Sequence, residues 1–555
     1  MKRLIIYTFL FAGLLSCKKD FLAPPPVSVV DAKAIFGSQL QAAGFLANIY
    51  TELTGGLDEF GNGQGFTQMC DEGEAGYPYL TTNGINVGSF DGSNNPDNII
   101  AAYYRKIRKC NVLLANKDLM TFDPALKAQY VAEAQFLRAF FYSELIKRYA
   151  GIPLVVSPVS YEEIQDAAAQ QAYKKNLKRA SYANCIDFVV KQLDSAASVL
   201  PWAPVDDLQR GKATAAAAIA LKAKVLLFAA SPLSNVTQPN NLIGYTTYDA
   251  NRWKLAADAA REFFTKNTAN GNWYGLYTGG FDKLFTEGRD AANKEMIFYR
   301  QGNSQTVTFF NSPNRLGGFS HFNISLNLVD KFEMKTGIPI NEAGSGYDEQ
   351  QWFANRDPRL AFTILRNGEL WKGITTQYYF KDEAGKPGLD WGTQFMTGVL
   401  MKKFQRSDGS TTPIKWHYLR LADVYLMLAE AENEFGGPSP EVYTALNTIR
   451  NRPSVLMPAL PNGLTKEQMR TRIQNERAVE MAFESQRFFD VRRWKTAEVI
   501  DNSPLQGFTI EKNGSNFIST RYTLETRKFT SKMYLYPFPE AEIFKGADIV
   551  QNPGY

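Results

Sequence analysis

Helical segments that follow one another in pairs are the feature that most constrains the fold of this chain. Residues 98–118 carry apolar side chains at roughly helical spacing. Asp123 and Pro124 begin a second segment, since Asp caps a helix and Pro suits its first turn, and this segment continues to about Tyr149. Further helical segments are predicted at 34–50, 176–199, 212–230, 250–266, 416–435, 439–451 and 466–494.

The pairing of these segments indicates a helical repeat. Residues 212–230 are rich in alanine, which favours helix and permits close approach of neighbouring helices. Antiparallel helix pairs of roughly 34 residues, with small residues at their contacts, are typical of tetratricopeptide repeats. We therefore predict a mainly α fold, in which a tetratricopeptide-like scaffold covers 34–270 and is completed by 416–555. The region between them, 271–415, is loop-rich, and its strand-like stretches are 295–300 and 377–381.

Long irregular loops interrupt this scaffold. Residues 54–97 are crowded with Gly, Asn, Asp and Pro, so they do not form regular elements, and long loops on a helical scaffold are usually functional or disordered.

Aromatic residues stand in these polar loops, and at 13% of the chain they are numerous enough for some to be displayed. A ring face can stack on the apolar C–H face of a sugar while neighbouring amides bond its hydroxyls, so the loops are candidate carbohydrate-binding surfaces. The alternative for each ring is packing against the scaffold. The candidate ligand-binding residues are Tyr77, Tyr79, Phe90, Asn94, Trp273, Tyr274 and Phe310.

The first residues indicate an export signal. Lys2 and Arg3 precede about twelve mostly apolar residues, a run too short to span a bilayer. The stretch LLSC that ends at Cys17 is similar to the bacterial lipobox, whose cysteine is acylated and becomes the new N-terminus; the alternative is an ordinary signal peptide with an incidental cysteine. We predict a signal peptide over 1–16, a lipid anchor with palmitate on Cys17 and a proline-stiffened spacer over 17–33. The protein is thus expected on a membrane, held by lipid alone.

Composition excludes several classes of protein. The chain has 61 basic and 56 acidic side chains, a net charge of +5, so no nucleic-acid surface is expected. Two distant histidines and the absence of a CxxC pair exclude the usual zinc layouts. Besides Cys17 there are Cys70, Cys110 and Cys185, an odd number that cannot close a disulfide framework, so we expect buried thiols. The sequence contains no GxSxG motif, P-loop or Rossmann glycine fingerprint.

One row of acidic residues is the best candidate for catalysis. Glu476, Glu480 and Glu484 stand four apart in a segment predicted as one helix over 473–494, and paired carboxylates can hydrolyse glycosides. Cations nearby would keep these acids ionised, the opposite of what a general acid needs. We therefore predict a structural ion-pair network, no catalytic residue and no enzymatic activity. The arginines that the same segment supplies are Arg477, Arg487, Arg492 and Arg493.

A short acidic loop is the remaining candidate for a metal. Asp71, Glu72 and Glu74 could supply oxygen ligands to a structural Ca²⁺ ion. The cluster lacks the alternating ligands and the sharp glycine of a defined calcium loop, so it is a weak candidate. No other cofactor is expected.

Several stretches are specific when they are taken together. They are SCKKDFL (16–22), EAQFLRAFFYSELIKRYAGIPLV (133–155), DPRLAFTILRNGELW (357–371), WHYLRLADVYLMLAEAENEFGG (416–437), NERAVEMAFESQRFFDVRRW (475–494) and YLYPFPEAEIFKGADIVQNPGY (534–555). The chain resembles, from Cys17 to Tyr555, the SusD/RagB family of nutrient-binding outer-membrane lipoproteins. This resemblance implies a helical fold with tetratricopeptide-like units, in which Trp416 and Trp494 belong to the core.

The resemblance also implies a role. Members of this family sit on the cell surface and act as the lid of a SusC-like TonB-dependent transporter, to which they deliver captured oligosaccharide. Some relatives carry peptides, so capture of a peptide or another nutrient stays open. A further alternative is an adaptor whose loops contact the transporter rather than cargo. The scaffold motifs do not specify the ligand, and its identity is not predicted.

Overall fold

The computed structural model describes residues 32–555, except for 57, 62, 78, 159–163, 287–291, 302–308, 393–394, 407–413 and 545–548. Cys17, the signal segment 1–16 and the spacer up to residue 31 lie outside the described residues, so their predictions stay predictions. Among the helices of the described part, none is both long enough and apolar enough to cross a membrane.

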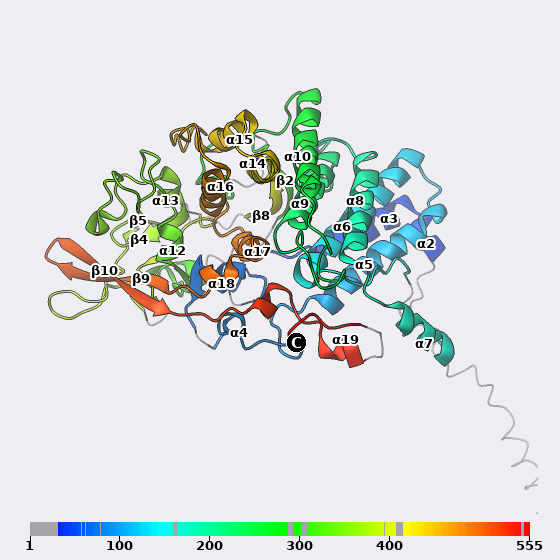
Figure 1. Ribbon diagram of the computed structural model, residues 1–555, viewed down its shortest axis with the longest axis horizontal. Helices are drawn as coiled ribbons and strands as arrows, with labels where there is room; N and C mark the ends of the chain where they lie inside the picture. The colour runs from blue at the N-terminus through cyan, green and yellow to red at the C-terminus, as the bar shows by residue number, and fades with distance from the viewer. Residues whose placement is uncertain are drawn as a thin grey trace, which may run out of the picture.

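Helices that pack against their neighbours along the chain build one half of the molecule (Figure 1). Helix α5 packs on α6, α6 on α8, α8 on α9, and α9 on α10. This succession of packed helices confirms the predicted helical scaffold and the mainly α fold. The helices of this half are α2 (Ala32–Phe36), α3 (Gln39–Thr51), α5 (Ile100–Ala115), α6 (Pro124–Tyr149), α7 (Ala167–Asn176), α8 (Tyr182–Ala197), α9 (Ala215–Ala230) and α10 (Asn251–Ala269).

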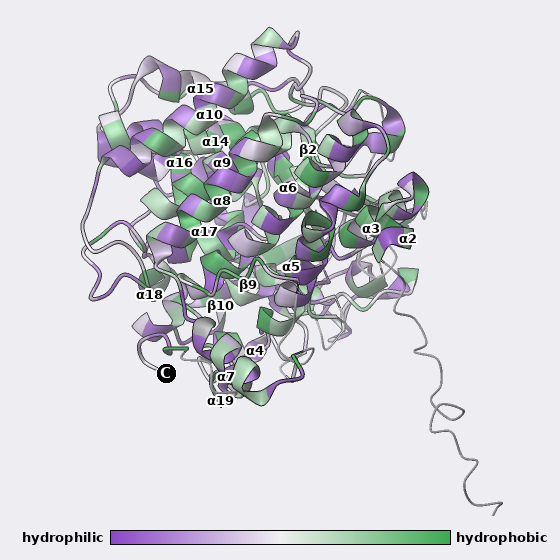
Figure 2. Ribbon diagram, turned by 90° about the vertical axis from the view of Figure 1, so that its right-hand side faces the viewer, coloured by the Kyte–Doolittle hydropathy of each residue, from purple (hydrophilic) through white to green (hydrophobic). Residues whose placement is uncertain are grey.

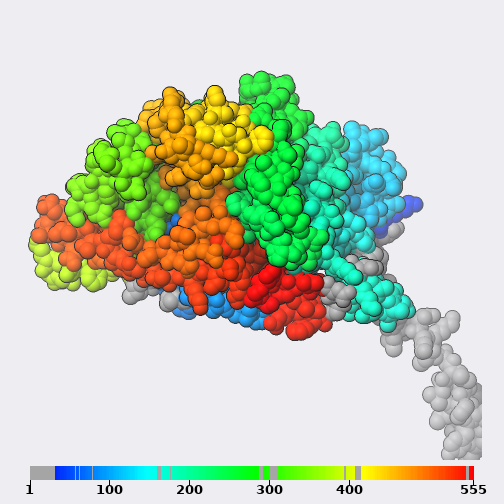
Figure 3. Space-filling view, viewed as in Figure 1, coloured from blue at the N-terminus to red at the C-terminus, as the bar shows by residue number. Residues whose placement is uncertain are grey.

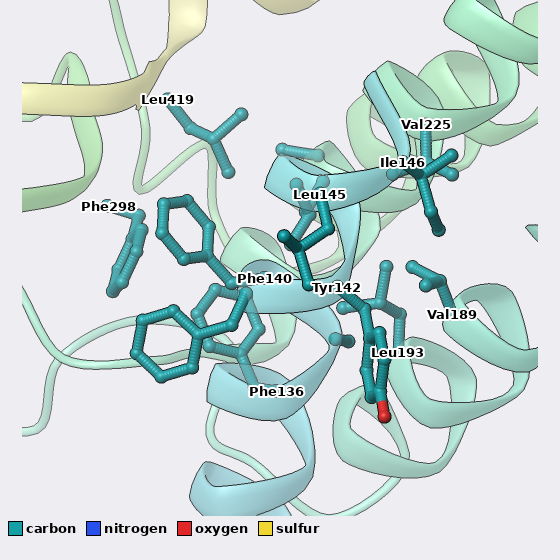
Figure 4. Packing of buried hydrophobic residues seen from close by; sticks show 14 of the residues in the cluster. Phe136, Phe140, Tyr142, Leu145, Ile146, Val189, Leu193, Val225, Phe298 and Leu419 are labelled. Carbon is teal, nitrogen blue, oxygen red and sulfur yellow. The ribbon is translucent and has the colours of Figure 1, made fainter. Parts of the chain in front are cut away.

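The alanine-rich helix α9 is buried among its neighbours. Thr214 caps it by accepting a hydrogen bond from the Ala217 N–H (3.1 Å), and most of its side chains are buried because α8, α10 and α14 (Leu421–Gly436) pack against it. Most helices around it carry both hydrophobic and hydrophilic residues, as amphipathic helices do (Figure 2). Large rings then fill the core: Phe136 and Phe140 of α6 meet Phe298 of a neighbouring strand (Figure 4).

A second group of helices follows late in the chain. Helix α10 contacts α14 (Leu421–Gly436), which packs on α15 (Pro440–Arg450) and α16 (Lys466–Glu480). The segment 466–494 is not one helix as predicted. It breaks after α16 and resumes as α17 (Arg487–Arg493), because Phe483 and Ser485 adopt left-handed backbone angles, with φ of 64° and 57°.

Short strands complete the fold. The strand order β1-β3-β7-β4 forms one sheet, and β2 pairs antiparallel with β8. The prediction that residues 54–97 form no regular elements is wrong at β1, which pairs with the distant β3, and at the short helix α4 (Asn83–Asn86). Strand β8 corrects the prediction of a helix from 416, since residues 415–420 pair with β2 before α14 begins. No strand forms over 377–381; Lys381 makes only an isolated bridge to Glu511. The paired strands are β1 (Gly73–Ala75), β2 (Met296–Gln301), β3 (Phe322–Ile324), β4 (Ile364–Arg366), β7 (Val399–Met401) and β8 (Lys415–Arg420).

A long hairpin in the C-terminal part of the chain was not predicted. Strands β9 (Leu505–Asn513) and β10 (Asn516–Glu525) pair antiparallel and project at one end of the molecule (Figure 1). The Phe380 N–H donates to the Ile510 carbonyl of β9 (2.7 Å). The loop around Phe380 lies beside the hairpin in the space-filling view (Figure 3). The two-residue strands β5 (Leu370–Trp371) and β6 (Ile374–Thr375) form a further small pair.

Two predictions about buried residues are confirmed. Trp416 and Trp494 are both buried, and the Trp494 indole N–H donates to the Glu430 carboxylate (2.7 Å). Cys70, Cys110 and Cys185 are buried free thiols.

Candidate functional site

Five aromatic rings from two distant parts of the sequence meet on the surface. The ring centroids of Tyr77 and Tyr79 lie 5.2 Å apart, and those of Phe309 and Phe310 lie 5.5 Å apart. Phe319 joins them, 4.9 Å from Phe309. We call these five residues the aromatic cluster. The His321 ring links its two halves, since it lies 5.3 Å from Tyr77 and 5.9 Å from Phe310.

The sheet positions the first half of the cluster. Strand β1 pairs antiparallel with β3, with Ala75 opposite Phe322. Beyond this last pair, the Gly76 N–H donates to the His321 carbonyl (3.0 Å). Tyr77 therefore leaves the sheet beside His321, and the irregular loop that follows carries Tyr79 outward.

A tight loop positions the second half. The His321 N–H donates to the Phe310 carbonyl (2.9 Å), and the Ser320 N–H donates to the Ser312 carbonyl (3.2 Å), so the loop doubles back on itself. Gly318 is required here, because a Cβ at this position would lie 2.1 Å from the Ser312 carbonyl oxygen. The loop thus brings Phe319 next to the rings near its start.

Three rings of the cluster face solvent. The exposed fractions of Tyr79, Phe309 and Phe319 are 77%, 50% and 39%. Tyr77 and Phe310 are half-buried. The two tyrosine rings contact each other, the three phenylalanine rings contact one another, and His321 lies between the two groups. Exposed aromatic faces in a polar loop region are the kind of surface that stacking on a sugar ring requires.

The structure places the predicted site residues unequally. Tyr77, Tyr79 and Phe310 come together in the cluster. Phe319 was missed, although it follows two glycines in a polar stretch, the same signal that singled out the other loops. Asn94 is exposed but serves its own loop: its side-chain oxygen accepts from the Asp91 N–H (2.7 Å), and its amide donates to the Ser89 carbonyl (3.2 Å).

The expectation that Phe90 and Tyr274 are displayed is wrong, since each is only 2% exposed. Phe90 packs against Tyr536 and Tyr555, which arrive from the far end of the chain. The Tyr274 backbone bonds to the Asn267 side chain, and its ring packs into the helical core.

Trp273 belongs to a different surface. Its half-buried ring contacts Tyr274, while the cations of Lys294 and Arg210 lie 5.2 and 5.9 Å from its centroid. Its ring contacts include no residue of the aromatic cluster, so the cluster is built without it.

The acidic row near the end of the chain is a network of ion pairs. Glu480 is fully buried and accepts from Arg359 (3.0 Å), Arg420 (2.8 Å) and Arg452 (2.8 Å). Burial alone would raise the pKa of this carboxyl group, but the three guanidinium groups outweigh burial and hold its pKa at about 2. A group ionised at all ordinary pH values cannot act as a general acid. The predicted structural network is confirmed.

The partners within this network differ from those expected. The arginines on the same segment pair elsewhere. Arg477 lies on α16 itself but bonds to other carboxylates, and Arg487, Arg492 and Arg493 belong to the separate helix α17. Their partners are Asp423 and Asp490 for Arg477, Asp71 for Arg487, Asp501 for Arg492, and Glu430 and Asp490 for Arg493.

The acidic loop proposed for Ca²⁺ is engaged with cations of the protein. Asp71 accepts two hydrogen bonds from Arg487 (2.7 and 2.8 Å), and Glu74 pairs with Arg527 (2.5 Å). Glu72 accepts from the Phe483 N–H (3.3 Å). Within the part of the chain that is described, no group of His, Cys, Asp and Glu is arranged to hold a metal ion.

A cavity of about 90 Å³ lies away from the cluster, between α6, α9 and residues 416–419. Its lysines are already paired: Lys147 donates to Glu144 (2.8 Å), and Lys224 donates to Asp423 (3.1 Å). No member of the aromatic cluster lines it. The cavity and the aromatic cluster are therefore two separate candidate binding sites. We favour the aromatic cluster, because stacking on a sugar needs accessible ring faces.

Comparison with known proteins identifies the family. The sequence profile of the SusD family matches residues 281–555, and a second profile, described as "Starch-binding associating with outer membrane", matches residues 78–227. The chain belongs to the SusD family. The SusD-like protein P25 of Formosa agariphila is 24% identical over 527 residues, which cover 89% of this chain and 90% of that one.

Solved structures of this family share the fold. A SusD-like protein from Bacteroides fragilis superposes with a TM-score of 0.75 at 25% identity and covers 94% of this chain and 98% of its own. A SusD-like carbohydrate-binding protein from the same organism also gives 0.75, at 22% identity, and covers 92% and 98%. The SusD-family scaffold therefore extends over nearly the whole chain, and the two loops that carry the aromatic cluster are mounted on it.

Proposed function

We propose that this SusD-family protein binds an oligosaccharide at the aromatic cluster and makes or breaks no bond in it. The observation that carries the proposal is the convergence of two loops, about 230 residues apart in the sequence, on either side of His321, which brings the five rings of the cluster together. The name of one structural relative, a carbohydrate-binding protein, and that of the profile matched at 78–227 support a glycan as cargo. The wholly paired acidic row supports binding without hydrolysis.

The location and partner form the second part of the proposal. Acylation of Cys17 would hold the protein on the outer membrane, facing outward, and the spacer would let the body reach a neighbour. The partner is a SusC-like TonB-dependent transporter, which takes the glycan that the cluster has captured. Mass spectrometry of the mature N-terminus tests the anchor, and co-purification of a β-barrel transporter with the tagged protein tests the partner.

Isothermal titration calorimetry tests glycan binding directly. The panel contains maltohexaose, laminarihexaose, cellohexaose and xylohexaose, and at least one should bind. Each stacked ring contributes about 1 kcal/mol, so Tyr79→Ala and Phe309→Ala should each weaken binding about fivefold. Trp273→Ala is the control: it also removes an aromatic ring from a polar loop, but one that lies outside the cluster, so the affinity should stay unchanged.

The result also separates the alternatives. Binding that survives loss of both cluster rings but fails in the Trp273 variant would move the site to residues 270–277. If no glycan binds but a pool of oligopeptides does, the cargo is a peptide. If neither glycans nor oligopeptides bind and the protein still captures the transporter, the adaptor role is favoured and the proposed function is refuted.

A further inference from the structure

A buried histidine beneath the aromatic cluster lacks hydrogen-bond partners. The side chain of His321 is 1% exposed, and neither Nδ1 nor Nε2 bonds to any group in the described structure. Buried polar groups in folded proteins are nearly always paired, because an unpaired donor or acceptor gives up its bonds to water without replacement. Two unpaired atoms on one ring thus ask for an explanation.

The other histidine shows how this chain treats a histidine that only supports the fold. His417 is also buried, but its Nε2 bonds to the Glu484 carboxylate within the ion-pair network. Its ring is fixed by that bond and by the stacked ring of Phe404. His321 has no such fixing bond and is held by ring contacts to Tyr77 and Phe310.

The protonation state of His321 defines what it can bind. Burial lowers its pKa to about 4, so the ring is neutral at pH 7. A neutral imidazole has one N–H donor and one nitrogen acceptor. A hydroxyl group is also both a donor and an acceptor, whereas a sulfate offers only acceptors and an ammonium only donors. The ring therefore matches uncharged, hydroxylated ligands.

The covering rings determine how a ligand reaches His321. Tyr77 lies on the loop just after the sheet, and its half-buried ring stands against the imidazole at 33°. The backbone bond that fixes this corner, from the Gly76 N–H to the His321 carbonyl, does not involve the Tyr77 side chain. Rotation of that side chain would remove one of the two aromatic rings that contact the imidazole and would leave the sheet intact.

We propose that His321 is a specificity-determining residue of the aromatic site: when Tyr77 swings aside, its imidazole forms hydrogen bonds with hydroxyl groups of a neutral glycan, donating through one ring nitrogen and accepting through the other. This inference rests on the proposed function, since it assumes that a glycan binds at the cluster. It assigns the rings above to stacking and the buried nitrogens below to selecting an uncharged sugar.

Opposite effects on stability and binding test the proposal. His321→Phe removes the unpaired nitrogens but keeps the ring, so the melting temperature of the unliganded protein should rise, while affinity for the best-binding oligosaccharide of the panel falls about fivefold. His417→Phe is the matched control, since it breaks a bond to Glu484: its melting temperature should fall and its affinity should not change. A fall in melting temperature with unchanged affinity for His321→Phe overturns the proposal.

A second measurement needs no variant at the site. The chain has only two histidines, so histidine labelled with ¹³C at Cε1 gives two ring signals, which His417→Phe assigns. Saturation with the glycan should shift the His321 signal and leave His417 in place. If calorimetry detects binding that Tyr79→Ala weakens, but the His321 signal does not move, the inference fails and the proposed function stands. If no glycan binds, both fail.

Discussion

Glu480→Gln tests whether the acidic row is structural. The Glu480 carboxylate is buried among three guanidinium groups, and its pKa falls from 4.5 to about 2; burial opposes this fall, and attraction to Arg452, Arg420 and Arg359 outweighs it. At 1.36 kcal/mol for each tenfold change in acid dissociation, the preference for the ionised form is worth about 3 kcal/mol. Removal of one partner from a buried ion pair costs about 3–5 kcal/mol, which agrees with this value.

Differential scanning calorimetry measures the effect. An unfolding entropy of about 2.1 cal/mol/K per residue gives about 1.2 kcal/mol/K for this chain of 555 residues, so the variant should melt about 3 °C lower at pH 7. Glu467→Gln, at an exposed position near the start of the same helix, is the control and should melt with the wild type. Glycan affinity should be the same in all three proteins, because Glu480 lies outside the aromatic cluster.

The pH dependence gives the sharper test. A carboxyl whose pKa is depressed in the folded state stabilises the protein above its unfolded pKa, 4.5, and this contribution is lost as pH falls toward 2. The gap in melting temperature between wild type and Glu480→Gln should therefore be full at pH 7 and shrink below about pH 4.5. Equal melting at pH 7, or a gap of constant size down to pH 3, would refute the argument. Loss of glycan binding without loss of stability would place Glu480 in the binding site.

Two further predictions concern the loops that carry the rings. Gly318→Ala places a Cβ against the Ser312 carbonyl, so calorimetric titration should show weaker glycan binding, whereas Gly275→Ala, which has open space around its Cβ, should bind normally. Arg527→Met removes hydrogen bonds to Glu74 and to the Gly73 carbonyl (2.7 Å), so limited proteolysis should cut faster near residues 68–80; an unchanged cleavage rate would show that this arginine is not what holds the loop.

The helical scaffold could be predicted because its signals are local. The caps, the alanine-rich segment and the apolar spacing act within a few residues, and they located α5, α6 and α9 closely. The predictions of secondary structure were wrong where residues distant in the sequence determine the local conformation. Residues 415–420 look like the start of a helix but become β8, because β2 lies alongside to pair with them. The break between α16 and α17 depends on the left-handed Phe483, whose N–H bonds to Glu72, over 400 residues away.

The sequence predicted only part of the candidate site, again because contacts between distant residues decide the rest. Composition identified loops with rings in polar surroundings, and two of these loops meet in the cluster. It could not tell which rings the rest of the chain covers. Phe90 is buried because Tyr536 and Tyr555 come back across it, and Tyr274 because the end of α10 holds its backbone. Nothing in the residues near Phe319 shows that it faces Phe309 rather than solvent alone.

The ion-pair network stabilises the fold, and the aromatic cluster is the proposed binding surface. Arg487 and Arg527 lie late in the sequence, yet they hold Asp71 and Glu74, the residues just before Tyr77. The network thus fixes where the first ring-bearing loop leaves the sheet, although it touches no ring of the cluster. Stability and binding should therefore separate: a substitution within the network at a distance from this loop, such as Glu480→Gln, lowers melting and spares affinity. Loss of an exposed ring should weaken glycan binding and leave the melting temperature unchanged, because Tyr79 and Phe309 bury little surface in the unliganded protein.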